Sequence, residues 1–227
     1  MNGINVTIYK EDDRHERVIN KVLKIYFDNF DKKLQVPQNI VLDRIKKKKY
    51  DLNLVKKNDD IIGFSFVVRF KKLIFLDYIA IDINHHGKGY GKILFNYIYN
   101  YYVKKEKIAD TLVLECENKL INMYKKWGCV KIPVKYTLSE EYHLNLMAKS
   151  ELPLDPTKYY KIKSELLNFN KQYFKKIKNQ NIKDMLPPSQ AFTTKCMKNI
   201  SIIINSILRD IYGNSGIYYN FLKGKPK

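Results

Sequence analysis

Residues 81–92 read Ile-Asp-Ile-Asn-His-His-Gly-Lys-Gly-Tyr-Gly-Lys, a glycine-rich stretch between a predicted strand and a predicted helix. It joins the most apolar run of the sequence, residues 73–83, to a segment of helical periodicity, residues 91–103. Its three alternate glycines allow the backbone to curl with its N–H groups turned inward, and the following helix adds the positive end of its dipole. The stretch therefore predicts a seat for a pyrophosphate, and Lys88 and Lys92 add positive charge beside it.

Two other phosphate-binding loops do not fit this stretch. The P-loop pattern G-x-x-x-x-G-K-[ST] fails because Ile93 follows Gly91-Lys92 and because His86 stands where the first glycine would be. The dinucleotide pattern G-x-G-x-x-G fails because the spacing here is G-x-G-x-G. A glycine-rich turn without a ligand is the structural alternative, but the gathering of three of the nine glycines at one helix start favours a ligand.

Hydrophobic periodicity predicts strands and helices on both sides of the loop. The expected strands are 5–9, 51–57, 61–70, 73–83, 111–116, 129–136 and 142–149, and the expected helices are 14–30, 39–48, 91–103 and 118–127. The order through residue 149 is therefore β-α-α-β-β-β-α-β-α-β-β. We expect residues 1–149 to form one domain.

Residues 150–227 differ in composition and are expected to form a basic helical C-terminal extension. Helical segments at 159–178 and 192–212 are divided by Leu186-Pro187-Pro188, and residues 151–227 carry 14 Lys and Arg against 5 Asp and Glu. Such an extension can pack on the sheet, cover a site as a lid or bind a partner. Its charge makes nucleic acid one such partner.

The whole 227-residue chain is basic, with 42 Lys and Arg against 23 Asp and Glu and a formal charge of +19. This charge attracts polyanions or phosphorylated cofactors, although a Lys-, Asn-, Ile- and Tyr-rich composition is also typical of AT-rich genomes. Three widely spaced cysteines predict neither a disulfide framework nor a zinc site, and the adjacent His85 and His86 cannot readily share a metal. We expect an intracellular, by default cytoplasmic, protein without signal peptide or membrane span.

The glycine loop resembles the acetyl-CoA-binding motif [QR]-x-x-G-x-[GA] of the GCN5-related N-acetyltransferases (GNAT). Gly89 and Gly91 occupy the two small-residue positions, whereas His86 departs from the Gln/Arg position, whose side chain helps to hold the loop while backbone amides bind the pyrophosphate. The resemblance covers about residues 4–149 and implies an α/β (α+β) fold with a mixed, mostly antiparallel sheet of about seven strands flanked by helices. It also implies acetyl-CoA as cosubstrate and no metal. The cofactor-binding residues that it implies are Ile79, Ile81, Asp82, Ile83, His86, Gly87, Lys88, Gly89, Tyr90, Gly91, Lys92, Asn118 and Tyr124.

Asn118, Tyr124 and Gly128 resemble a second GNAT motif, which follows the fifth strand. By this resemblance Asn118 contacts the pantetheine arm, and Tyr124 donates a proton to the departing thiolate as general acid. A phenol suits that role because it is protonated at neutral pH. One tyrosine among 18 is otherwise an ordinary helix aromatic, and only the combination with the other motif residues favours function.

The general base is less defined by the sequence. Asp77 is the candidate because it precedes the loop on a buried strand, where burial raises the pKa of a carboxyl and where it is expected to share a face with Phe75, Ile79 and Ile81. The family's common acidic position falls on Phe75 instead. Two alternatives stay open: a base that removes the proton of the amine through a water molecule, or a reaction without a general base. The weaker candidates are Glu115 and Glu117.

The resemblance implies an N-acetyltransferase that moves an acetyl group from acetyl-CoA to a primary amine by direct attack in a ternary complex, with a strand N–H between Ile79 and Ile81 stabilising the oxyanion. The acceptor can be a protein lysine or N-terminus, a polyamine or an amino sugar. The charge of +19 argues against cationic acceptors unless the acceptor cleft is locally acidic. The alternative is a catalytically weak GNAT-shaped binding module whose basic tail engages nucleic acid. The sequence indicates no oligomeric state.

Overall fold

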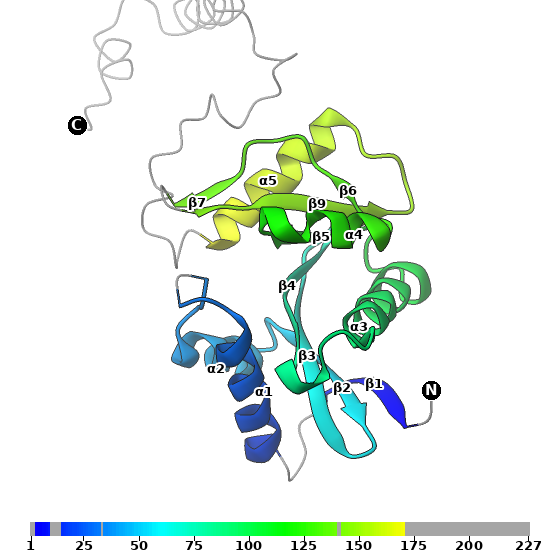
Figure 1. Ribbon diagram of the computed structural model, residues 1–227. Helices are drawn as coiled ribbons and strands as arrows, with labels where there is room; N and C mark the ends of the chain where they lie inside the picture. Colours follow the sequence, from blue (N-terminus) through cyan, green and yellow to red (C-terminus); the bar gives the residue numbers. More distant parts are fainter. Residues whose placement is uncertain (1–2, 10–14, 33, 140–141, 171–227) are drawn as a thin grey trace, which may run out of the picture. The chain divides into compact units, whose positions relative to one another are not determined.

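The computed structural model describes residues 3–9, 15–32, 34–139 and 142–170, which all lie within one compact unit. Its main sheet has seven strands in the order β1-β2-β3-β4-β5-β9-β6, and every neighbouring pair is antiparallel except β4 and β5 (Figure 1). This confirms the predicted mixed, mostly antiparallel sheet. The strands are β1 (Ile4–Ile8), β2 (Asp51–Lys57), β3 (Asp60–Arg69), β4 (Ile74–Ile81), β5 (Thr111–Cys116), β6 (Val130–Lys131) and β9 (Asn145–Ser150), and β7 (Thr137–Ser139) pairs with β8 (Tyr142–His143).

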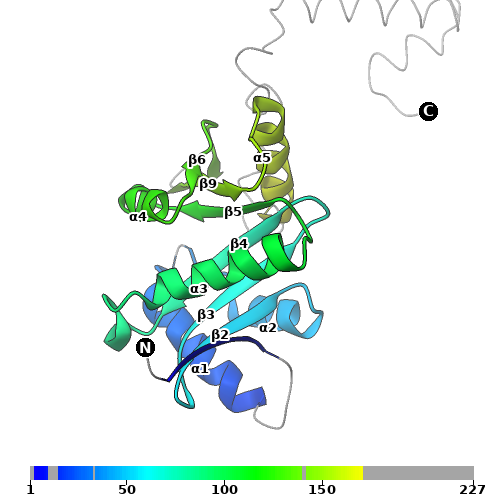
Figure 2. The ribbon, with the colours of Figure 1, turned by 90° about the vertical axis from the view of Figure 1, so that its right-hand side faces the viewer.

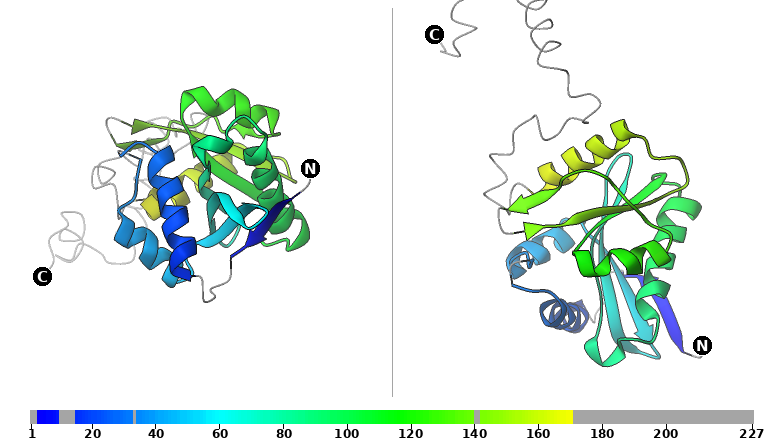
Figure 3. Two further views of the ribbon diagram at one scale, coloured as in Figure 1. Left: turned by 60° about the horizontal axis from the view of Figure 1, so that its bottom comes forward. Right: turned by 45° about the horizontal axis from the view of Figure 1, so that its top comes forward.

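Helices α1 (His15–Asn29) and α2 (Gln38–Lys46) cover one face of the sheet, and α3 (Tyr90–Ile98) covers the other (Figures 1 and 2). Figure 3 shows the same layers from two further directions. The apolar residues of α1 recur at helical spacing and are buried, and Tyr26 packs its ring against Phe64, Phe66 and Tyr78 of the sheet. Burial of these large aromatic side chains holds α1 on the strands that carry the candidate site.

A β-bulge in β4 determines where the sheet opens. The pairing of β4 with β3 skips from Leu76 to Tyr78, so Asp77 is an extra residue without a partner on β3. On its other side β4 pairs with β5 only over Ile74–Leu76, and the last pair joins Leu76 to Leu114. A bulge bends its strand and increases the local twist, and the two parallel strands separate beyond this pair. The structure therefore has an opening in the sheet next to the glycine loop.

The bulge also corrects the prediction that Asp77 shares a face with Phe75, Ile79 and Ile81. The extra residue shifts the alternation of side chains, so the prediction is wrong for the two isoleucines. Ile79 and Ile81 pack with the apolar core beneath α3, whereas Asp77 bonds to Arg44 of α2 on the opposite face. The Asp77 carboxylate and the two isoleucines thus lie next to the opening on opposite faces of the sheet.

Three predicted elements differ in extent. The expected strand 142–149 is divided into β8, which pairs with β7, and β9 of the main sheet. The expected strand 129–136 is paired only at β6, because Pro133 within it lacks the N–H that a strand ladder requires. The expected helix 91–103 consists of α3 and a π-helical continuation, η2 (Tyr99–Lys105). The chain also forms the short helices η1 (Ile83–His85), η3 (Asn118–Leu120) and α4 (Ile121–Lys126).

The first helix of the predicted C-terminal extension packs on the domain. This helix, α5 (Pro156–Asn170), lies on the same face as α2, where the Phe169 ring contacts Phe75 and the Arg44 guanidinium. The helical segments predicted beyond Asn170 lie outside the described residues. None of the helices in the described ranges combines the length and apolar character that a membrane crossing requires.

Candidate active site

The glycine loop has the backbone conformation that its sequence predicts. Gly87 and Gly89 have φ values of 74° and 80°, in the left-handed region that other residues rarely adopt. Gly89 is also the N-cap of α3 and has no side chain to accept hydrogen bonds from the first helical turn, so these N–H groups are left for another acceptor. Together with the helix dipole they form a suitable seat for a phosphate anion.

His86 holds the loop against the end of β4. Its Nε2 atom lies 2.7 Å from the carbonyl oxygen of Ile81 and, when protonated, donates a hydrogen bond to it. A second anchor is Asp82, which accepts a hydrogen bond from the N–H of Asn84 and pairs with Lys21 of α1 at 3.1 Å. The side chain of His86 therefore performs the loop-holding role that the resemblance gives to Gln or Arg.

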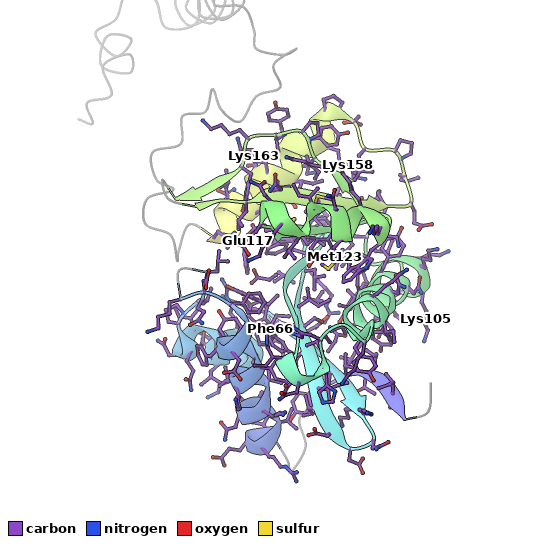
Figure 4. All side chains as sticks on the ribbon, in the orientation of Figure 1. Phe66, Lys105, Glu117, Met123, Lys158 and Lys163 are labelled. Atoms are coloured by element: carbon purple, nitrogen blue, oxygen red, sulfur yellow. The ribbon has the colours of Figure 1, made fainter. Side chains whose placement is uncertain are left out.

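A cleft of about 600 Å³ runs from this loop into the opening between β4 and β5. Figure 4 labels Glu117 and Met123, which border the cleft from the η3–α4 side. On the opposite border, the N–H of Asp82 donates to Ile62 of β3, so alternation along the strand directs the N–H groups of Ile79 and Ile81 towards the opening. These are the amides expected to stabilise an oxyanion.

Nine of the thirteen predicted cofactor-binding residues line this cleft, namely Ile79, Ile81, His86, Gly87, Gly89, Tyr90, Gly91, Lys92 and Tyr124. Asp82, Ile83, Lys88 and Asn118 are not among its lining residues. The ammonium group of Lys88 donates to the carbonyl of Asn84 at 3.1 Å, and the side-chain oxygen of Asn118 accepts a hydrogen bond from Asn145 at 2.9 Å. A contact of these four residues with a cofactor stays a prediction.

Tyr124 lines the cleft at the end where the strands separate. Its side chain is buried against Phe95 and Trp127, and this burial raises the pKa of the phenol well above its ordinary value of 10. The hydroxyl therefore keeps its proton at neutral pH, as an acid must before it donates. The half-buried side chain of Trp127 packs against the core and also lines the cleft.

A second, smaller cavity of about 90 Å³ adjoins the cleft and shares the residues Phe30, Leu34, Glu117 and Leu120 with it. Asp77 and Glu115 both line this cavity. They are the first residues after the last β4–β5 pair. The bulge and the separating strands therefore place two carboxyl groups side by side where β4 and β5 part, a place that is called the fork below.

The Asp77 carboxyl group is buried and held by two partners. Arg44 donates to it from α2 at 3.1 Å, and the Tyr50 hydroxyl also donates to it. Burial raises the pKa of Asp77 to about 6, although the Arg44 charge and the hydrogen bond from Tyr50 act in the opposite direction.

The Glu115 carboxyl group has uncharged partners. It accepts hydrogen bonds from the Tyr136 hydroxyl and, at 3.0 Å, from the Asn170 amide. Burial raises the pKa of Glu115 to about 8, with the charge of Asp77 contributing and the two hydrogen bonds opposing. The fork thus contains one carboxyl group paired with a cation and one whose raised pKa of about 8 favours the protonated form at neutral pH.

The raised pKa of Glu115 predicts a pH-dependent stability. The folded chain binds this proton up to pH 8, whereas the unfolded chain releases it near the ordinary value of 4.5, so the free energy of unfolding should fall as the pH rises between these values. Urea unfolding from pH 5 to 9 should give a flatter profile for Glu115→Gln. The control Glu117→Gln, which replaces the carboxylate of a side chain that is 35% exposed, should keep the slope of the wild type. Equal slopes in wild type and Glu115→Gln would contradict the assignment.

Comparison with known proteins agrees with this geometry. Residues 19–129 match the sequence profile of the acetyltransferase (GNAT) family. This region is a GNAT-family acetyltransferase domain. A search of curated protein sequences found no match to the chain.

Solved structures share the GNAT fold of this domain at low sequence identity. A putative GNAT acetyltransferase from Bacteroides thetaiotaomicron is 17% identical with a TM-score of 0.60, over 71% of this chain and 95% of that one. A Bacillus subtilis acetyltransferase in complex with CoA is 14% identical with a TM-score of 0.50, over 66% and 99%. The ribosomal-protein-S18-alanine N-acetyltransferase of Escherichia coli is 15% identical with a TM-score of 0.50, over 66% and 97%.

Several residues of the GNAT site are not predicted by the sequence. Phe30 and Leu34 reach both cavities from the connection between α1 and α2, and Asn170 reaches Glu115 from α5. No local pattern marks these residues, because each acquires its place only through packing across the fork. The described residues contain no cluster of three or more His, Cys, Asp or Glu side chains that could hold a metal ion.

Proposed function

We propose that this GNAT domain transfers an acetyl group from acetyl-CoA to a primary amine by direct attack in a ternary complex. The diphosphate of acetyl-CoA binds the amides of residues 86–91, and its arm follows the cleft to the opening between β4 and β5. The proposal rests on one observation: a phosphate seat and a buried, protonated Tyr124 line the same cleft of about 600 Å³, a volume typical of ligand sites. The CoA complex of the B. subtilis structure and the amine acceptor in the name of the E. coli enzyme support it.

In the proposed reaction the amine nitrogen forms a bond to the acetyl carbon, and the bond from that carbon to the CoA sulfur breaks. The N–H groups of Ile79 and Ile81 stabilise the negative charge on the carbonyl oxygen. Tyr124 donates its proton to the departing thiolate, and a carboxylate at the fork accepts a proton from the amine. Asp77 is one candidate for this base, and Glu115 is the second because it lines the same cavity and its pKa of about 8 lies near physiological pH.

Gly89→Val tests the phosphate seat. A β-branched residue disfavours a φ of 80°, at a cost of about 1–2 kcal/mol, so the loop should leave the conformation that directs its amides into the cleft. Isothermal titration calorimetry should show a loss of acetyl-CoA affinity of about tenfold or more. The control is Gly3→Val, because Gly3 has a similar φ of 88° but precedes β1 and does not line the cleft. Equal acetyl-CoA affinities in the two variants would contradict the proposed seat.

The alternative of a nucleic-acid-binding module stays a prediction. The basic segments that favour it lie beyond Asn170, outside the described residues. Within the described ranges no observation favours it over acetyl transfer.

A further inference from the structure

The small cavity at the fork is acidic, although the chain as a whole is strongly basic. Three carboxylates, Asp77, Glu115 and Glu117, line it, and its lining contains no Lys, Arg or His. The chain carries 42 Lys and Arg against 23 Asp and Glu, so the charged residues of this lining are opposite in sign to the net charge of the chain. Cations outside this lining pair with two of the three groups, so the cavity offers a place for one further cation, at Glu115. The argument from net charge against cationic acceptors therefore does not apply here.

Glu115 is the carboxylate left open to an incoming cation. Asp77 has Arg44 behind it at 3.1 Å, and Glu117 has Lys119 at 2.9 Å. The bonds that the structure gives to Glu115 come from the neutral Tyr136 and Asn170, and no ion pair joins it to another described residue. An ammonium group at the fork would supply the missing positive charge and would stabilise the ionised form of Glu115.

The rest of the cavity is narrow and apolar. Its volume of about 90 Å³ is well below the 300–1,000 Å³ of typical small-molecule sites, so only a slim group fits. The polar groups other than the carboxylates already have partners, since Asn170 donates to Glu115 and the Tyr78 hydroxyl donates to the carbonyl of Leu34. A sugar with several hydroxyl groups would find few free partners here. The apolar residues of the lining are Phe30, Leu34, Val36, Leu120 and Leu144.

From this lining we infer that the acceptor is the end of an unbranched alkyl chain that carries a primary ammonium group, and that it enters the small cavity with its nitrogen between Asp77 and Glu115. This inference names the substrate class of the proposed acetyltransferase and therefore rests on that function. The methylene groups pack on the apolar lining, and Glu115 accepts one ammonium proton, which leaves a neutral amine to attack the acetyl carbon. The second proton, which the nitrogen loses after the attack, replaces the one that Tyr124 gives to the departing thiolate. Both the lysine side chain and the end of a linear polyamine have this chemistry.

The test is an acceptor panel with acetyl-CoA, using thiol release as readout. The acceptors are n-pentylamine, neopentylamine, glucosamine, alanine amide, spermidine and a peptide with one internal lysine and a blocked N-terminus. We expect kcat/KM for n-pentylamine to exceed that for the branched isomer, the sugar and the α-amine by at least tenfold. The ratio between spermidine and the lysine peptide identifies which source of the alkylammonium group the protein prefers.

Glu115→Gln provides a matched variant that keeps the side-chain size and the oxygen that accepts from Tyr136. It should lower kcat/KM for n-pentylamine at least tenfold while acetyl-CoA affinity in calorimetry stays within twofold. The control Asp60→Asn removes an exposed carboxylate at the start of β3, and it should change neither value.

Each outcome of this test is decisive. Preferred turnover of glucosamine, alanine amide or neopentylamine overturns the inference and leaves the acetyltransferase function standing. Acetyl-CoA binding without turnover of any alkylamine also overturns it. If the wild type binds no acetyl-CoA in calorimetry, the proposed function itself fails.

Discussion

Arg44→Met should destabilise the domain by about 3–5 kcal/mol, because it removes the cation from a buried ion pair and leaves the Asp77 carboxylate in an apolar environment. The side chains of Arg44 and Asp77 are only 1% and 8% exposed, so water cannot solvate the carboxylate that is left without its cation. Arg44 also lies over the rings of Tyr50 and Phe169, 4.9 and 4.3 Å from their centroids, so α5 loses a contact as well. Urea unfolding at pH 8 measures the effect.

Two further measurements separate the buried charge from lost packing. In the double variant Arg44→Met/Asp77→Asn no carboxylate is left without its cation, so its loss of stability should be smaller than the sum of the two single losses. The penalty for Arg44→Met should also shrink from pH 8 to pH 5. The cation lowers the pKa of Asp77, so without it the carboxyl group binds a proton more readily in the folded state, and its cost is relieved as the pH falls. Additive losses at both pH values would exclude the ion pair as the cause.

Tyr124→Phe should reduce kcat by about 10²–10⁴-fold, the usual contribution of a positioned general acid. The substitution removes one oxygen and leaves the ring to fill its place against Phe95 and Trp127. Acetyl-CoA affinity should stay within about twofold, since backbone amides of the loop supply the proposed diphosphate contacts. Steady-state kinetics with n-pentylamine, together with calorimetry, separates the two parameters.

The matched control is Tyr97→Phe, which removes a hydroxyl from a half-buried tyrosine of α3 outside the lining of the cleft. Its kcat should equal that of the wild type. If Tyr124→Phe retains more than half of the wild-type kcat, Tyr124 is not the general acid. A weaker acetyl-CoA affinity with unchanged kcat would instead assign Tyr124 to cofactor binding.

The order of strands and helices could be predicted because it depends on local rules. Apolar residues at helical spacing mark α1, and an uninterrupted apolar run marks β4. The loop conformation is equally local, since the left-handed φ values of Gly87 and Gly89 are natural only for glycine. The strand at 129–136 was predicted too long because the apolar pattern continues past Pro133, which ends the pairing.

The sequence alone predicted the glycine loop and the order of strands and helices, because both depend on residues that are close together in the chain, and the family resemblance added the mixed sheet and the choice of Tyr124 among 18 tyrosines. Only the tertiary structure placed Asp77 at a bulge, brought Glu115 beside it, and supplied Arg44, Tyr136 and Asn170 as their partners. The pKa of a buried carboxyl depends on the charges and hydrogen bonds around it, and here those groups come from three separate segments: α2, the connection between β6 and β7, and α5. No pattern within one segment encodes such an arrangement, so the gathering of carboxyl groups around the small cavity becomes visible only after the chain has folded.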